Sequence, residues 1–248
     1  MAPRPELYLF DSGTLRLGEV EVPVPFFLIR HAEGDVVVDG GNPLAVARDV
    51  HAHWGPLADQ FRVSMSEDQH CAAQLGGLGV TLESVRYVVQ THLHLDHTGA
   101  LGHFADAGVV VHERELATAR AGDSPISGGY VRADYDRPEI EWKPVHGDID
   151  LFSDGALSLI ETPGHTAGHM SVLLRLPETG PVLLTADAAD TRAQWEGRAQ
   201  PRGHFSRDQA ARSIARLRDL ANRTGALVVV GHDADEWAKL RHAPECYR

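Results

Sequence analysis

Short apolar runs, each bounded by glycine, proline or charged residues, recur along the chain and predict buried β-strands. They are rich in valine, leucine and isoleucine and span about four or five residues, which suits a strand better than a helix. In the first half of the chain we expect strands at 6–10, 26–30, 36–39, 85–89 and 109–112. In the second half we expect them at 157–161, 171–175, 182–186 and 227–230.

A helical pattern is clearest between residues 208 and 223, where small and aliphatic residues recur at three- and four-residue spacing. Ser206 is expected to cap this helix and Gly225 to end it. Shorter helices are expected at 43–53, 67–78 and 100–105. The stretches 53–68 and 120–144 fit neither pattern. Loops of that length in a compact domain are usually functional or disordered, and we expect these two to form walls of a pocket.

Strands followed by helices occur twice along the chain, which predicts an αββα sandwich: two mixed β-sheets packed face to face and flanked by helices. A chain of 248 residues is ordinary for one such α/β unit. The sequence has no linker, low-complexity tract or short-period repeat. We therefore expect a single domain spanning residues 1–248.

Four potential metal ligands follow the strand predicted at 85–89, in the segment Thr-His-Leu-His-Leu-Asp-His-Thr. They are His92, His94, Asp96 and His97. Burying three imidazoles and a carboxylate beside one another is costly unless each polar group finds a partner, and a divalent cation provides one for all of them. The alternative is a histidine-rich surface loop, but this segment begins where a strand ends.

Three further potential ligands also follow predicted strands: His165, Asp187 and His232. Strand ends of one sheet edge carry side chains to a common place, so seven ligands predict a two-metal site. A carboxylate can bind one cation with each of its oxygens, so Asp187 is expected to bridge the two ions. The expected ligands are His92, His94 and His165 for one ion, and Asp96, His97 and His232 for the other.

The pattern His-x-His-x-Asp-His, followed by isolated His, Asp and His after successive strands, resembles the metallo-β-lactamase superfamily over nearly the whole chain. Within it, the segments 162–169, 184–188 and 231–233 are most similar to the N-acyl-homoserine lactonases. The resemblance implies the metallo-β-lactamase fold. It also implies a metal-dependent hydrolase that opens a small lactone ring, such as that of an N-acyl-homoserine lactone, and so acts in quorum quenching. His169 is expected to pack beneath the site as a hydrogen-bond donor, as its counterpart does in the family.

A water or hydroxide between two such ions would have its pKa lowered from about 15.7 to about 7, which makes it a nucleophile at neutral pH. Asp96 is expected to orient this hydroxide and to act as a catalytic residue as well as a ligand. A nitrogen ligand from His94 favours zinc. The di-iron relatives resemble His-x-Glu-x-Asp-His instead, with a carboxylate where this chain has His94. We expect two divalent ions, namely Zn²⁺, although cobalt, manganese and iron tolerate the same ligands.

Asp190 departs from the lactonases that this chain resembles, in which a tyrosine at this position hydrogen-bonds the substrate carbonyl. We treat Asp190 as a second candidate catalytic residue. A carboxylate donates a hydrogen bond only when protonated. Asp190 could donate if its pKa is raised, or it could act through a water molecule. Alternatively, Tyr130 or Tyr135 could supply the hydrogen bond to the substrate carbonyl, or the metals alone could stabilise the oxyanion. It could also simply tether its loop, as short carboxylates often do.

Composition excludes several other functions. The formal net charge of −12 argues against nucleic acid as a partner, and no stretch is apolar enough to span a membrane. Residues 1–17 lack the apolar core of a signal peptide, and the two cysteines are too few for a disulfide framework, so we expect a cytoplasmic enzyme. The expected partner is a small-molecule lactone, and a homodimer is an open possibility.

Two alternatives remain open. One is a thioester or other ester hydrolase of the hydroxyacylglutathione hydrolase type. No cluster of arginine and lysine in the sequence is suited to hold the carboxylates of such a substrate. The other is a non-catalytic metal-binding relative, although all seven ligands are present. Trp54, Phe61 and Met65 suggest an apolar wall for an acyl chain, and core packing explains them equally well.

Overall fold

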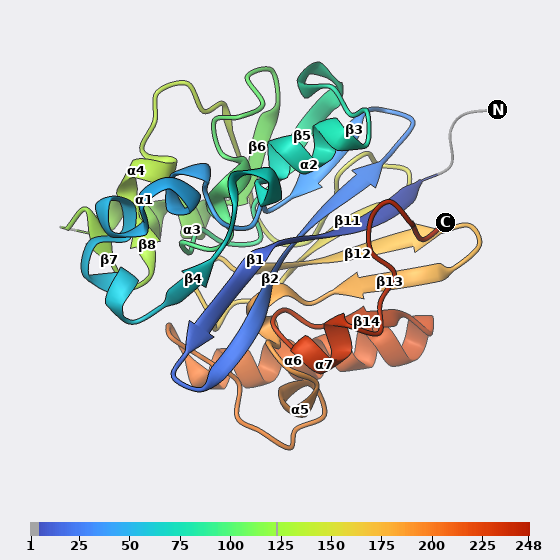
Figure 1. Cartoon of the computed structure of the whole chain (residues 1–248). Helices are drawn as coiled ribbons and strands as arrows, with labels where there is room; N and C mark the ends of the chain where they lie inside the picture. The colour runs from blue at the N-terminus through green and yellow to red at the C-terminus, as the bar shows by residue number, and fades with distance from the viewer. Residues whose placement is uncertain (1–4, 123) are drawn as a thin grey trace.

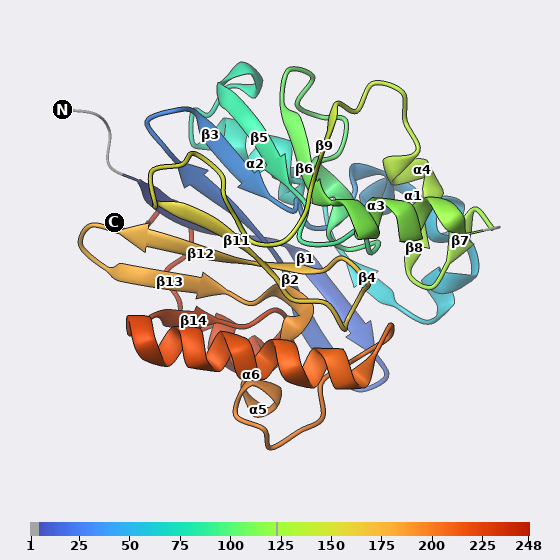
Figure 2. The same cartoon turned by 180° about the vertical axis from the view of Figure 1, so that it is seen from behind.

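The computed structural model describes residues 5–122 and 124–248. Residues 1–4 and residue 123 lie outside the described residues. Residues 1–4 are part of the segment 1–17, in which we expect no signal peptide, and residue 123 is part of the stretch 120–144. Two β-sheets pack face to face in the middle of the molecule, with helices outside them (Figures 1 and 2). This is the predicted αββα sandwich.

The first sheet is mixed and has seven strands in the order β4-β1-β2-β3-β5-β6-β9. Strands β1, β2 and β3 are antiparallel neighbours, whereas β3, β5, β6 and β9 run parallel. Parallel strands need both faces covered, and all five residues of β6 are buried. The bounds are β1 (Glu6–Leu17), β2 (Val20–Arg30), β3 (Asp35–Val38), β4 (Arg62–Ser64), β5 (Val85–Val89), β6 (Gly108–His112) and β9 (Trp142–Val145).

The second sheet has five strands in the order β10-β11-β12-β13-β14. Its neighbours are antiparallel except for β13 and β14, which are parallel. The bounds are β10 (Ile149–Asp150), β11 (Leu157–Glu161), β12 (Met170–Leu176), β13 (Gly180–Leu184) and β14 (Leu227–Val229). A short hairpin of β7 (Ile126–Ser127) and β8 (Tyr130–Val131) stands apart from both sheets.

The main core lies between the two sheets. Leu7, Leu9 and Val38 of the first sheet share one buried cluster with Leu159 and Val172 of the second. The outer face of the first sheet is covered by the helices α2 (Cys71–Gly77) and α3 (Glu113–Ala121), and that of the second by α6 (Arg207–Thr224). Figure 2 shows α6 lying along its sheet. The remaining helices are α1 (Leu44–Trp54), α4 (Arg132–Tyr135), α5 (Arg192–Trp195) and α7 (Ala234–Trp237), with 3₁₀ turns at Gly55–Asp59, Glu67–Gln69, Leu82–Ser84, Thr98–Ala100 and Ala186–Ala188.

Helix α6 has the predicted ends. The hydroxyl oxygen of Ser206 accepts a hydrogen bond from the backbone N–H of Gln209, and Gly225 adopts the left-handed conformation that ends the helix. The helix predicted at 100–105 is wrong: a 3₁₀ turn at Thr98–Ala100 runs into irregular chain. Leu101 is extended, with a ψ of 127°, and Gly102 has a φ of 72°, so neither residue has the backbone conformation of an α-helix.

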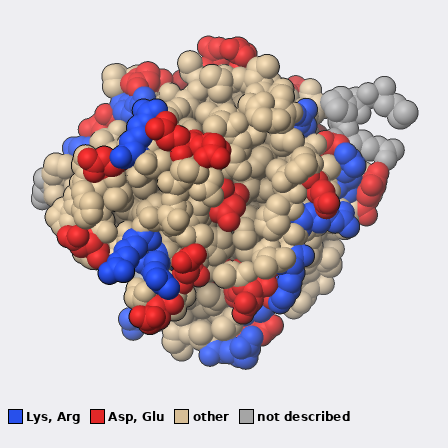
Figure 3. All heavy atoms as spheres, in the orientation of Figure 1, with Lys and Arg blue, Asp and Glu red and all other residues tan. Residues whose placement is uncertain are grey.

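Charged groups of both signs are interspersed on the face drawn in Figure 3. No helix within the described residues has the length and apolar character needed to cross a membrane.

Candidate metal centre

The seven predicted ligands follow the carboxyl ends of four strands. The segment that carries His92, His94, Asp96 and His97 leaves β5, and the other three ligands follow β11, β13 and β14. These ends lie at one side of the sandwich, so a rigid scaffold brings together residues that are up to 140 positions apart in the chain. Every one of the seven is buried except Asp96, which is partly open.

The carboxylate of Asp187 lies between two groups of histidines. Its Oδ1 is 3.3 Å from Nε2 of His97 and 3.2 Å from Nε2 of His232. Its Oδ2 is 3.3 Å from Nε2 of His165 and 3.9 Å from Nε2 of His92. Each oxygen therefore faces a different group, as a bridging carboxylate requires.

Two triplets of ligand atoms each lie within 4.8 Å of one another: His92, His94 and His165 in one, and Asp96, His97 and His232 in the other. They are the two sets expected from the sequence. The buried Nε2 atoms of His92 and His97 have no hydrogen-bond partner among the described residues. Unpaired buried nitrogens are costly, and a divalent ion in each triplet would satisfy them. The residues present thus fit two metal ions.

The ring nitrogens that face away from the cluster are held by hydrogen bonds. Nδ1 of His97 lies 2.8 Å from Oδ2 of Asp39, and Nδ1 of His232 lies 2.8 Å from the carbonyl oxygen of Pro23. Asp39 also accepts hydrogen bonds from the backbone N–H and the hydroxyl of Thr91. Such partners fix the orientation of metal-binding histidines. Asp39 was missed in the sequence, because Asp-Gly-Gly after a strand indicates only where the strand ends.

Backbone strain accompanies the site. Asp39 has a φ of 61° and Ala186, directly before Asp187, a φ of 45°. This left-handed region is unfavourable for residues other than glycine and is often found at functional sites. His169 packs beneath the cluster as expected, but its Nε2 accepts rather than donates a hydrogen bond, from the backbone N–H of Asp187. The position of Asp187 is therefore determined by its backbone as well as by its histidine neighbours.

A second buried carboxylate, Glu115 of α3, ties together the two loops that carry His94 and His165. Oε1 accepts hydrogen bonds from the backbone N–H of Leu93, at 3.1 Å, and from the hydroxyl of Tyr130, at 3.0 Å. Oε2 accepts one from the backbone N–H of Gly168, at 3.0 Å. A Cβ at position 168 would lie 2.3 Å from the Glu115 nitrogen, so only glycine fits there. The sequence analysis missed Glu115, because no helix was predicted at Glu113–Ala121 and the hydrogen-bond partners of Glu115 are distant in the sequence.

The surrounding charges stabilise the ionised form of Asp187. Burial alone would raise its pKa, but the neighbouring imidazoles, His232 first, hold the pKa well below its usual range. Burial lowers the pKa of His94 and of His165 to about 3. Neutral imidazole is the form that binds a metal, so these two side chains are already in the protonation state that binding needs.

Asp190 lies beside the cluster, with an oxygen within 4.8 Å of the ligand atoms of His165 and Asp187. Burial, and then the charge of Asp187, raise its pKa to about 7. Its backbone N–H donates to Oε1 of Gln194, and the amide of Gln194 donates back to Oδ2 of Asp190. The hydroxyls of Tyr130 and Tyr135 bond elsewhere, to Glu115 and to the carbonyl of Ala119, so neither replaces the missing tyrosine.

A cavity of about 690 Å³ opens beside the cluster. Its apolar wall comes from the β1–β2 hairpin, through Leu15 and Val22, and from the segment after α1, through Leu57 and Phe61. The two irregular stretches thus line the pocket as expected, since Gly128 and Gly129 form another side. The buried Trp54 belongs to the core behind this wall rather than to the wall itself.

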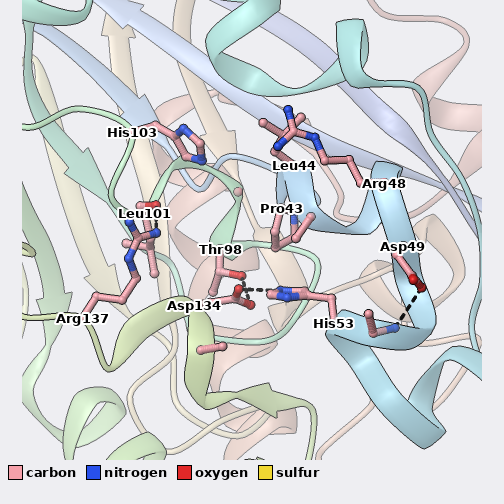
Figure 4. A pocket seen from close by; sticks show the side chains of 14 residues that line it. Pro43, Leu44, Arg48, Asp49, His53, Thr98, Leu101, His103, Asp134 and Arg137 are labelled. Carbon is pink, nitrogen blue, oxygen red and sulfur yellow. Dashed lines mark hydrogen bonds and ion pairs between the residues drawn. The ribbon is translucent and has the colours of Figure 1, made fainter.

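A smaller cavity of about 480 Å³ is lined by residues of α1, of α4 and of the segment from Thr98 to His103 (Figure 4). At its base, Nε2 of His53 lies 2.7 Å from Oδ1 of Asp134, and the hydroxyl of Thr98 donates to Oδ2 of Asp134. The hydrogen bond to Asp134 raises the pKa of His53, although partial burial opposes this. Figure 4 shows both side chains pointing at Asp134.

Replacing His53 by glutamine should therefore destabilise the protein more at pH 6 than at pH 9. The protonated His53 stabilises the fold fully below its unfolded pKa of about 6.5, and this contribution disappears as the pH rises through the raised folded pKa. Urea unfolding of metal-free protein should show a difference of about 1 kcal/mol between the two pH values. The exposed neighbour His51 is the control, and equal effects of His51→Gln and His53→Gln at both pH values would contradict the interpretation.

Comparison with known proteins agrees with this geometry. Residues 20–232 match the profile of the metallo-beta-lactamase superfamily. The N-acyl homoserine lactonase AttM of Azorhizobium caulinodans is 44% identical, over 97% of this chain and 98% of its own. A crystal structure of an N-acyl homoserine lactone hydrolase, with its product N-hexanoyl-L-homoserine at the catalytic metal centre, superposes with a TM-score of 0.89 at 26% identity, over 98% of this chain and 99% of the other. A single-substitution variant of AiiA from Bacillus thuringiensis, with N-decanoyl-L-homoserine bound at the active site, matches with the same TM-score, identity and coverage. The chain therefore belongs to the metallo-β-lactamase superfamily and, within it, to the N-acyl homoserine lactonases.

Proposed function

We propose that this protein is a metal-dependent hydrolase that opens the ring of N-acyl-homoserine lactones and so quenches quorum signals. The observation that carries the proposal is the bridging position of Asp187 between two triplets of ligands, beside a cavity with an apolar wall. A lactone head group would lie at the ligand cluster. Its acyl chain would lie along Leu15, Val22, Leu57 and Phe61.

The seven side chains His92, His94, Asp96, His97, His165, Asp187 and His232 would hold two divalent cations, and we propose zinc, since five nitrogens and two carboxylates suit it. When bound, the cations would polarise the ester carbonyl and lower the pKa of a water molecule. Asp187 would keep the two ligand groups together. Asp96, the one partly open ligand, would orient the attacking water and accept its proton. When the ring C–O bond breaks, the leaving ring oxygen would take up this proton.

The charges of the cavity favour a neutral substrate. Arg202 is the only arginine or lysine among the described residues that line it, against the carboxylates of Glu21, Asp96, Asp187, Asp190, Asp233 and Asp235. A glutathione thioester carries carboxylates that would need more cations than this. The alternative of a hydroxyacylglutathione-type hydrolase is therefore less well supported than a lactonase.

A lactone panel tests the proposal. Purified protein with two equivalents of zinc should release one proton per N-acyl-homoserine lactone opened at pH 8, detected with an indicator dye. Mass spectrometry should find the ring-opened N-acyl homoserine as the product. Lactones with a hexanoyl chain should have a lower KM than unsubstituted γ-butyrolactone, because the acyl chain can bury apolar surface against the apolar wall of the cavity. Faster turnover of thioesters or β-lactams than of every lactone would contradict the proposal.

We further propose that residues 1–248 act as one catalytic domain in the cytoplasm. Both cysteines, the buried Cys71 and the partly exposed Cys246, are free thiols, which suits a reducing compartment. Burial raises the pKa of Cys71 to about 12, so this thiol is also unreactive. Cell fractionation with an antibody tests the location, and light scattering of purified protein decides between a monomer and a homodimer.

A further inference from the structure

The cavity beside the metal centre is lined by Arg202, whose guanidinium contacts a buried carboxylate. Nε of Arg202 lies 3.3 Å from Oδ2 of Asp190. The Asp190 side chain is 4% exposed, whereas that of Arg202 is 52% exposed. Nε thus faces a buried carboxylate, while the Nη groups form no hydrogen bond to another described residue and are free to act as donors.

Both partners of this ion pair are connected to the metal centre. Asp190 is fixed by its reciprocal hydrogen bonds with Gln194. The carbonyl oxygen of Arg202 lies 3.2 Å from Nδ1 of His165, so the backbone of Arg202 supports one of the predicted ligands. Since Asp190 itself lies within 4.8 Å of the ligand atoms of His165 and Asp187, the guanidinium stands beside the cluster at which the proposed function places the lactone.

We propose that Asp190 is a positioning residue for Arg202, and that Arg202 donates hydrogen bonds to the carbonyl oxygen of the lactone. This inference rests on the proposed function. During hydrolysis, the oxygen of water bonds to the carbonyl carbon, the ring C–O bond breaks, and the ring oxygen takes up a proton. The carbonyl oxygen gains negative charge and becomes part of the product carboxylate. Among the carboxylates of this cavity, a cation at that oxygen stabilises the charge where it develops.

Arg202→Gln tests the catalytic part of the proposal. Loss of one preorganised donor should lower kcat by about 10²-fold. The inhibition constant of the ring-opened hydroxy acid should rise, because the product carboxylate loses the same partner. The matched control is Arg198→Gln on the same loop, since Arg198 is exposed, pairs with Glu196 and is not among the residues that line the cavity. Its kcat should stay within about twofold of the parent protein, as for a surface change.

Asp190→Asn tests the positioning part. It keeps the size of the side chain but removes the charge that holds Arg202, so kcat should fall by about 10-fold. If Asp190 acts only through Arg202, the change should cost nothing more in the Arg202→Gln background. A further loss of about 10-fold in the double variant would show that Asp190 acts on the substrate directly and would overturn this part of the proposal.

Added guanidinium provides a readout that a purely structural role would not affect. In Arg202→Ala, guanidinium chloride at millimolar concentration should restore part of kcat, whereas sodium chloride at the same ionic strength should not. Absence of rescue, together with an Arg202→Gln variant as active as Arg198→Gln, would overturn the proposal. These outcomes leave lactone hydrolysis by the parent protein intact. Failure of the parent protein to open any lactone would instead reject the proposed function.

Discussion

Replacing Asp187 by asparagine will lower lactone turnover by about 10³-fold or more. Even groups that merely hydrogen-bond a metal ligand contribute about 10–100-fold to affinity or activity, and Asp187 contacts both ligand groups itself. The amide that replaces one oxygen is a poor ligand and carries no charge. Repulsion between the two cations would then be less well balanced, so at least one ion should be lost. Steady-state kinetics and elemental analysis of the same samples measure both effects.

A matched control for this change is Asp106→Asn, on an exposed loop and outside the cluster. It should keep both ions and full turnover. His232→Ala provides a second comparison, because His232 belongs to one triplet only and its loss should empty chiefly the site shared with Asp96 and His97. If Asp187→Asn bound two ions and retained turnover, Asp187 would not bridge the sites.

Replacing Glu115 by alanine is expected to cause the largest loss of stability. Three donors, the buried backbone N–H groups of Leu93 and Gly168 and the hydroxyl of the partly buried Tyr130, would lose their acceptor at once. Each unsatisfied buried group costs about 1–3 kcal/mol, so the free energy of unfolding should fall by about 3–5 kcal/mol. Urea unfolding of the metal-free protein measures this fall.

The same substitution should weaken zinc binding by about 10–100-fold, because Glu115 holds the loops of His94 and His165 together. Competition with a chelating dye measures the affinity without any turnover. Glu113→Gln is the control: Glu113 lies on the same helix, is exposed and, among the described residues, pairs only with the surface residue His146. Its effect should stay within about 0.5 kcal/mol. A Glu115→Ala variant as stable as this control would contradict the role of Glu115 as a tie between the loops.

The fold could be predicted from the sequence where burial alone determines local structure. Strands β5 and β11 have the predicted limits because the buried residues of each are aliphatic: Val85, Val88 and Val89 in β5, and Leu157, Leu159 and Ile160 in β11. The long hairpin of β1 and β2 could not be predicted in full. Its outer half, up to Leu17 and from Val20, mixes charged and apolar residues and is held by pairing between the strands rather than by its own pattern.

The candidate ligands could be identified because histidine and aspartate at strand ends are unusual in an apolar setting. Asp39 and Glu115 could not, since each acts on a residue that is distant in the sequence. Asp39 contacts His97, and Glu115 contacts Leu93 from α3, a helix that the sequence pattern did not predict. Partners of this kind are set by tertiary packing, and only the structure brings them together.

The measurement that tests the account most directly is a zinc titration of metal-free protein, with bound metal and hydrolysis of N-hexanoyl-homoserine lactone followed in the same samples. The seven ligands and the position of Asp187 between the triplets predict that turnover rises until two ions are bound per chain. Full turnover with one ion bound, and no change on binding a second, would contradict a dinuclear lactonase.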